Sequence, residues 1–260
     1  MDETQEAPLR PAPVVRRADV ADIVAAIEAG LRDFRRAPLY GLFFGGVYAL
    51  GGVAACYFMT AIGWGWLVMP MMAGFALIGP FIAVGLYEVS RRLSTGETLS
   101  FGAVLACMFR QGGRELGWMA LICVFAFVMW MYQIRLMVAL FFSFAPIELG
   151  AFLRMLVTTQ QGLIFLTIGT AWGAVIAIVI FSLTVISFPL LLDRDRDFIT
   201  AMIASVQSVI KSPVVMVGWG LVTVALILIA CLPFFLGLPI VLPVLGHATW
   251  HLYKRLVEPE

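Results

Sequence analysis

Long apolar blocks dominate this sequence. Several of them reach or exceed the roughly 20 residues that a helix needs to cross a bilayer, and the block at about 162–191 is among the longest. Apolar residues make up 62% of the chain and charged residues only 13%, against about a quarter in soluble domains. The sequence therefore predicts an all-α membrane protein with several spanning helices.

Prolines, glycines and charged residues divide the apolar sequence into six predicted crossings, within one domain over residues 18–256. The crossings lie at about 39–61, 67–89, 116–137, 162–191, 213–233 and 237–255. Residues 1–17 carry prolines and mixed charges without apolar periodicity, so we predict a disordered cytoplasmic tail there.

Each pair of crossings is preceded by a shorter amphipathic segment, at 18–36, 99–110 and 198–211. Such a helix lies along a membrane surface or against the inner ends of other helices. The order of one surface helix and two crossings indicates a threefold pseudo-repeat of parallel units, of the kind common in transporters. In the first segment, one helical face carries Val20, Ile23, Val24, Ile27, Leu31 and Phe34, and the charged residues fall largely on the other face, namely Asp22, Glu28, Arg32, Asp33 and Arg36.

The basic residues predict how the protein is oriented. If the six crossings are placed as above, fifteen of the seventeen lysines and arginines fall on the side of the N-terminus, and only Arg135 and Arg154 fall on the other. Basic residues accumulate on the cytoplasmic side of membrane proteins. We therefore expect both termini to lie in the cytoplasm and, with a bacterial source, the protein to lie in the inner membrane.

The last crossing holds both histidines and resembles the end of the second. Pro243 to Leu256 reads PVLGHATWHLYKRL, and Pro80 to Leu93 reads PFIAVGLYEVSRRL, each with an aromatic residue at the eighth position. This alignment places Glu88 opposite His251. We therefore predict one polar cluster near the cytoplasmic interface, formed by Tyr87, Glu88, His247, Trp250 and His251.

Two functions are open for the histidines. His247 and His251 are four residues apart, so both rings project from one helical face, as in zinc sites on helices. A metal ion needs three or four ligands, however, and no third ligand is evident. The favoured prediction is a structural or pH-sensing cluster without metal or cofactor, and a metal or haem site is the alternative.

Arg135 is the most deeply placed charge in a predicted crossing. It lies seventeen residues after Trp118, or about 26 Å along a helix, which brings it close to the outer side of a hydrocarbon core. A long arginine side chain reaches the headgroups from there. We predict an outer-interface residue, and the alternative is a functional pore or pairing charge.

Four strings in the chain resemble an uncharacterised family of bacterial six-helix inner-membrane proteins. They are RDFRRAPLYGLFFGGVYALGG, GFALIGPFIAVGLYEVSRRL, SFPLLLDRD and LPIVLPVLGHATWHLYKRL. Some members of that family carry the label cytochrome c oxidase subunit I. A haem–copper catalytic subunit would need six histidines, whereas this chain has two, on one helix. The resemblance thus implies an inner-membrane location. The number of histidines predicts that the chain is not a catalytic oxidase subunit.

Nucleotide-binding loops, nucleophile elbows and paired catalytic acids are not found in the sequence, and nothing in it indicates nucleic-acid binding. We predict a non-enzymatic accessory or scaffold protein, whose partners are the lipid bilayer and other membrane proteins, a respiratory complex among them. A small-solute or ion permease or channel is the alternative. The prolines that interrupt the crossings favour the permease, since transport sites often use broken helices.

Overall fold

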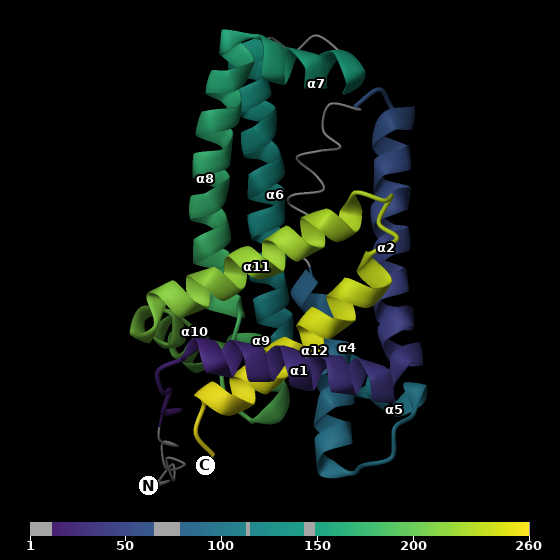
Figure 1. Cartoon of the computed structure of the whole chain (residues 1–260), viewed down its shortest axis with the longest axis vertical. Coiled ribbons are helices and arrows are strands. Elements are labelled where there is room, and N and C mark those ends of the chain that lie inside the picture. The colour runs from purple at the N-terminus through teal and green to yellow at the C-terminus, as the bar shows by residue number, and fades with distance from the viewer. Residues whose placement is uncertain (1–11, 65–78, 113–114, 143–148, 260) are drawn as a thin grey trace, which may run out of the picture.

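The fold is known from a computed structural model that describes residues 12–64, 79–112, 115–142 and 149–259 (Figure 1). Apart from one isolated antiparallel bridge, the secondary structure of these residues is helical. The shorter helices are α1 (Val20–Arg36), α4 (Gly79–Thr95), α5 (Phe101–Gly112), α7 (Leu149–Thr158), α9 (Ser187–Asp193) and α10 (Phe198–Lys211). The longer ones are α2 (Pro38–Ala61), α6 (Glu115–Phe142), α8 (Gln160–Thr184), α11 (Pro213–Cys231) and α12 (Leu238–Leu256).

Four stretches of helix in the described residues are long and apolar enough to cross a membrane. They are Pro38–Ala61, Glu115–Phe142, Gln160–Asp193 and Pro213–Cys231, which correspond to the first, third, fourth and fifth predicted crossings. The second predicted crossing falls partly outside the described residues. The sixth corresponds to α12, which is not among the four because its second half, with two histidines, Lys254 and Arg255, is too polar.

The helices form two zones along the long axis of the molecule (Figure 1). The long helices α2, α6 and α8 run lengthwise, and α7 lies across one end. At the opposite end lie α1, α5, α9, α10 and the C-terminal part of α12. The largest buried core is at this second end, and every residue from Thr184 to Leu192 is buried there. The rest of α6, α8 and α11 leaves many large apolar side chains exposed, as expected for helices that lipid surrounds.

Helix α1 has three faces where the sequence predicted two. Asp19 begins it with a capping box, in which Asp19 and Asp22 satisfy each other's backbone N–H groups. The charged edge, with Glu28 and Arg32, is exposed as expected. Asp22 and Asp33, however, are buried with Ala26, Ala29 and Gly30 against α12. The assignment of both aspartates to an exposed polar face is therefore wrong, because small residues between them let α12 approach.

The apolar face of α1 stays open. Val20 and Val24 are 61% and 51% exposed, and Ile23, Ile27 and Leu31 are half-buried. A surface-lying helix has this arrangement when its apolar face meets the bilayer.

The N-terminal segment is ordered further upstream than the sequence predicted. Val15 pairs with Val257 in the isolated bridge and is buried. The Arg16 N–H donates to the Leu256 carbonyl at 2.8 Å, and the Arg16 guanidinium binds both carboxylate oxygens of Asp22, at 2.9 and 2.6 Å. Residues 14–16 are therefore not part of a disordered tail, because the end of α12 offers them backbone partners that no local pattern reveals.

Two junctions between a shorter helix and a long apolar helix have similar backbone geometry. Ala37 joins α1 to α2 with φ −133° and ψ 54°, and Ser212 joins α10 to α11 with φ −144° and ψ 60°. A proline follows each one and begins the next helix, since the first helical position needs no N–H donor. The two junctions thus share a backbone conformation, and the threefold pseudo-repeat stays a prediction.

Candidate functional site: a buried histidine network

Four polar side chains from three helices meet in the core at the α1 end of the molecule. We call them the histidine network: Asp33 of α1, Ser90 of α4, and His247 and His251 of α12. Ser90 and His247 are fully buried, Asp33 is 6% exposed, and the His251 side chain is 22% exposed. The network thus reaches from the interior toward the surface.

The hydrogen bonds of the network fix its proton positions. The Ser90 hydroxyl donates to Asp33 Oδ2 at 2.8 Å. A serine has one proton, so its 2.7 Å contact with His247 Nδ1 has the imidazole as donor and Ser90 Oγ as acceptor. His251 Nε2 donates to the same Asp33 oxygen at 2.7 Å. His247 Nε2 then carries a lone pair, and this buried atom has no partner among the described residues.

The Asp33 carboxylate is the centre of charge in this network. Burial disfavours its ionised form, but hydrogen bonds from His251 and Ser90 outweigh burial and hold the pKa of Asp33 below its ordinary value of 3.8. Asp33 is therefore ionised at neutral pH and accepts the hydrogen bonds of Ser90 and His251 as a carboxylate. Asp22 belongs to the same helix, and the guanidinium of Arg16 likewise holds the pKa of Asp22 below its ordinary value.

The connectivity of the network differs from that of a nucleophilic triad. In a triad the imidazole lies between serine and carboxylate and removes the serine proton. Here Ser90 lies between His247 and Asp33 and gives its proton to the carboxylate, so nothing activates its oxygen. Among the described residues, no group of three or more histidine, cysteine or acidic side chains could hold a metal ion. The arrangement joins three helices through side-chain hydrogen bonds.

The network only partly matches the predicted cluster. Both histidines belong to it, but the carboxylate beside them comes from Asp33 and not from Glu88. Glu88 is fully buried and binds Arg91 Nε at 2.8 Å and Arg92 Nε at 2.6 Å, so the placement opposite His251 is wrong. The two arginines one turn further along the same helix were the signal that could have indicated this pairing.

The aromatic members of the predicted cluster pack in the same core. Tyr87 is 5% and Trp250 1% exposed, and Trp250 lies 5.6 Å from the Tyr253 ring, measured between centroids. Tyr253 in turn donates to Asp193 Oδ2 at 2.7 Å and ties α12 to α9. The aromatic residues therefore surround the end of α12 that holds the network.

Arg135 lies far along α6, where its guanidinium carbon is 5.8 Å from the centroid of the Trp64 ring. Both side chains are exposed. Arginine over an indole is a favourable cation–π arrangement, and both residue types are common at the headgroup level.

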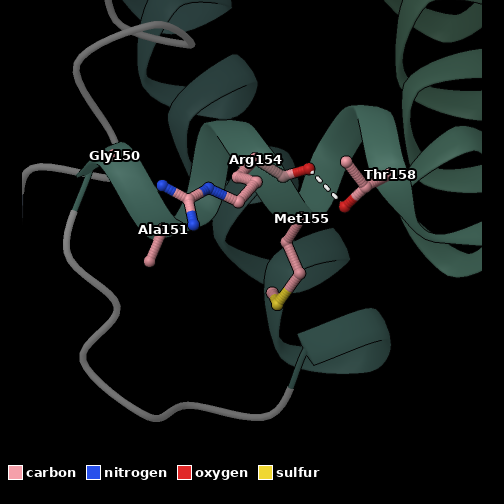
Figure 2. Close-up of a pocket in the computed structure, with 5 residues that line it drawn as sticks. All are labelled: Gly150, Ala151, Arg154, Met155 and Thr158. Carbon is pink, nitrogen blue, oxygen red and sulfur yellow. Dashed lines mark hydrogen bonds between the residues drawn. The ribbon is translucent and has the colours of Figure 1, made fainter.

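Two surface hollows in the described part lie away from the network. One follows a single face of α7, along Gly150, Ala151, Arg154, Met155 and Thr158, where Thr158 Oγ1 donates to the Arg154 carbonyl at 2.8 Å (Figure 2). The other lies between Gln111, Glu115 and residues 191–196. Neither hollow includes a member of the network.

Four apolar stretches of helix long enough to cross a bilayer, in the part of the chain that the structure describes, define an integral membrane protein of the α-helical class. Residues 68–193 match the family described as "Predicted integral membrane protein (DUF2189)". The match confirms the resemblance to a membrane family without an assigned activity, and it adds no support for the oxidase label. No curated protein and no solved structure matches the chain.

Proposed function

We propose that the protein is a non-enzymatic accessory or scaffold protein of a membrane complex, with a respiratory complex as one candidate. In this proposal it crosses the bacterial inner membrane six times, through the four apolar stretches, residues 67–89 and α12, with both termini in the cytoplasm. The orientation is supported by the arrangement of charge. Helices α1, α5 and α10, with their arginines and lysine, gather at one end, whereas α7 with Arg154 lies at the other (Figure 1).

The observation that carries the accessory function is an exposed aromatic stripe on α6. Trp118, Phe125 and Tyr132 are spaced seven residues apart and are 56%, 63% and 64% exposed. Leu121 and Val128 lie between them and are 57% and 41% exposed. Apolar residues at alternating three- and four-residue steps form the seam along which one helix packs on another. The stripe therefore fits a helix of a partner membrane protein.

In this proposal the histidine network is a structural latch. It holds α1 and α4 against α12 and so keeps the compact end of the molecule in one arrangement while α6 stays free to bind. Hydrogen bonds made between three different helices support this role, because a network in the interior favours one packing over others.

A photocrosslinking experiment tests the accessory function. A benzophenone amino acid is placed at Phe125, in the stripe, or as a control at Phe44 of α2, which is 3% exposed. Irradiation of intact membranes should produce a discrete protein adduct from position 125 and none from position 44. If position 125 yields only lipid adducts, the stripe binds no protein and the accessory function is wrong.

The alternative is a small-solute or ion permease, and one observation favours it. The unpaired His247 Nε2 lies at the inner end of a hydrogen-bonded path to the partly exposed His251, and buried ionisable groups in membrane proteins often mark ion pathways. Proteoliposomes loaded with a pH-sensitive dye would show proton flux that His247→Phe abolishes. Flux equal to that of protein-free liposomes would contradict the permease.

A further inference from the structure

Three arginines form an exposed basic edge where α1 turns into α2. Arg32, Arg35 and Arg36 are all exposed, and no hydrogen bond or ion pair connects their side chains to another described residue. Glu28 is the exposed acid nearest in sequence, one turn before Arg32. The edge therefore keeps an excess of two positive charges that the protein itself does not neutralise.

The turn that presents these arginines is rigid. The Phe34 ring lies so close to Gly41 that a Cβ on this glycine would be 2.7 Å from Phe34 Cδ2. Ala37 is 4% exposed, and its N–H donates to the Asp33 carbonyl at 2.9 Å. Because α1 lies across the direction of α2, the elbow holds the basic edge beside the first turn of an apolar spanning helix (Figure 1).

The first turns of α2 offer an apolar surface directly after the arginines. Leu39, Leu42 and Phe43 are 68%, 44% and 42% exposed. A cationic edge above an apolar strip matches a molecule with an anionic head and hydrocarbon chains. Basic clusters at the cytoplasmic end of a membrane helix attract anionic headgroups for the same electrostatic reason.

We propose that the α1–α2 elbow is a binding site for an anionic phospholipid. Arg35 and Arg36 hold the phosphate, Arg32 adds attraction, and the acyl chains lie along Leu39, Leu42 and Phe43. The similar junction between α10 and α11 is not such a site. Its Lys211 ammonium donates to the Val15 carbonyl at 2.7 Å, and its Ser212 hydroxyl accepts from the Ala18 N–H at 2.8 Å.

The test measures lipid binding to the full-length protein in mild detergent by native mass spectrometry. Phosphatidylglycerol, the anionic probe, should bind more tightly than the zwitterionic phosphatidylcholine. The double variant Arg35→Gln/Arg36→Gln should lose about 30-fold in phosphatidylglycerol affinity, as expected when two arginines leave an anionic surface. Its affinity for phosphatidylcholine should not change.

A matched double variant separates this site from diffuse attraction. Arg17→Gln/Arg110→Gln removes two other exposed arginines from the same end of the molecule and should leave phosphatidylglycerol binding nearly unchanged. An equal loss in both variants, or equal binding of the two lipids by the wild type, would overturn the proposal. Displacement of the lipid by an equal concentration of inorganic phosphate would also overturn it, because it would identify a simple anion site.

Discussion

At the scale of single residues, Asp33 explains why the compact end holds together. One of its oxygens accepts hydrogen bonds from Ser90 and His251, which belong to two other helices. A carboxylate 6% exposed is stable only with such partners, since an unpaired buried charge is strongly unfavourable. The same interaction holds the His251 ring in position and, through Ser90, that of His247.

Replacement of Asp33 by alanine should destabilise the protein. Asp33→Ala leaves the Ser90 hydroxyl without its acceptor, and an unsatisfied buried polar group costs about 1–3 kcal/mol. We expect a lower melting temperature in detergent by differential scanning fluorimetry. Glu28→Ala, at an exposed position on the same helix, is the control and should melt like the wild type. Equal melting of both variants would show that the network contributes no stability.

The lowered pKa of Asp33 predicts a dependence of stability on acid. Because the folded pKa lies below the ordinary value of 3.8, ionised Asp33 stabilises the fold above that pH. This contribution is lost as the pH falls through the folded pKa. The difference in melting temperature between wild type and Asp33→Asn should therefore shrink below about pH 4. The pKa of Asp22 is also lowered, but Asp22 is present in both proteins, so its contribution cancels in the difference. A difference that does not shrink in acid would contradict the lowered pKa of Asp33.

At the scale of secondary-structure elements, close packing between α1 and α12 decides which face of α1 is buried. A Cβ on Gly30 would lie 2.6 Å from the backbone nitrogen of Ala248 and 2.7 Å from the Val244 carbonyl oxygen. Backbone atoms cannot move aside as a flexible side chain can, so only glycine fits at this crossing. The charged edge and the apolar face of α1 are then left to solvent and membrane.

A methyl group at Gly30 should push the two helices apart. Gly30→Ala overfills a contact between backbones, which typically costs about 1–3 kcal/mol. The matched control is Gly46→Ala in α2, where the new Cβ would meet nothing within 4 Å. That control should be neutral or stabilising by up to about 1 kcal/mol, since alanine favours helix. Thermal unfolding compares the two variants. An unchanged melting temperature of Gly30→Ala would show that the two helices can move apart without loss of stability.

At the scale of the whole molecule, the two zones correspond to two environments. The compact end buries a core and a polar network, whereas the long helices expose apolar side chains that only lipid or a partner helix can cover. The basic helices lie at the compact end and α7 lies at the opposite end (Figure 1). In the orientation that we propose, the compact end lies at the cytoplasmic face.

Thiol labelling in intact cells tests that orientation. In a variant without the four native cysteines, a new cysteine at Ala151 of α7 should react with a membrane-impermeant maleimide. A cysteine at Glu28 of α1 should react only after the membrane is permeabilised. Both positions are exposed, so access to the reagent is the variable. The opposite labelling pattern would reverse the proposed topology.

The sequence by itself determined where most helices lie. Apolar length, periodicity and proline act within one helix, so α2, α11 and the three surface helices begin and end within about two residues of their predicted bounds. The resemblance to a membrane family was also readable from the sequence, because it depends on local patterns.

The partners of Asp33 depend on how the helices pack. Arg91 and Arg92 engage Glu88 within one helix, a pairing that local spacing could have indicated. Asp33, by contrast, is enclosed by the approach of α12 at Gly30. Val15 is likewise held by a partner distant in sequence, Val257, with which it forms an antiparallel bridge. Helix formation depends on residues three or four positions away in the sequence. The burial of a charge such as Asp33 depends on which distant helix packs against it, and a local sequence pattern does not predict that.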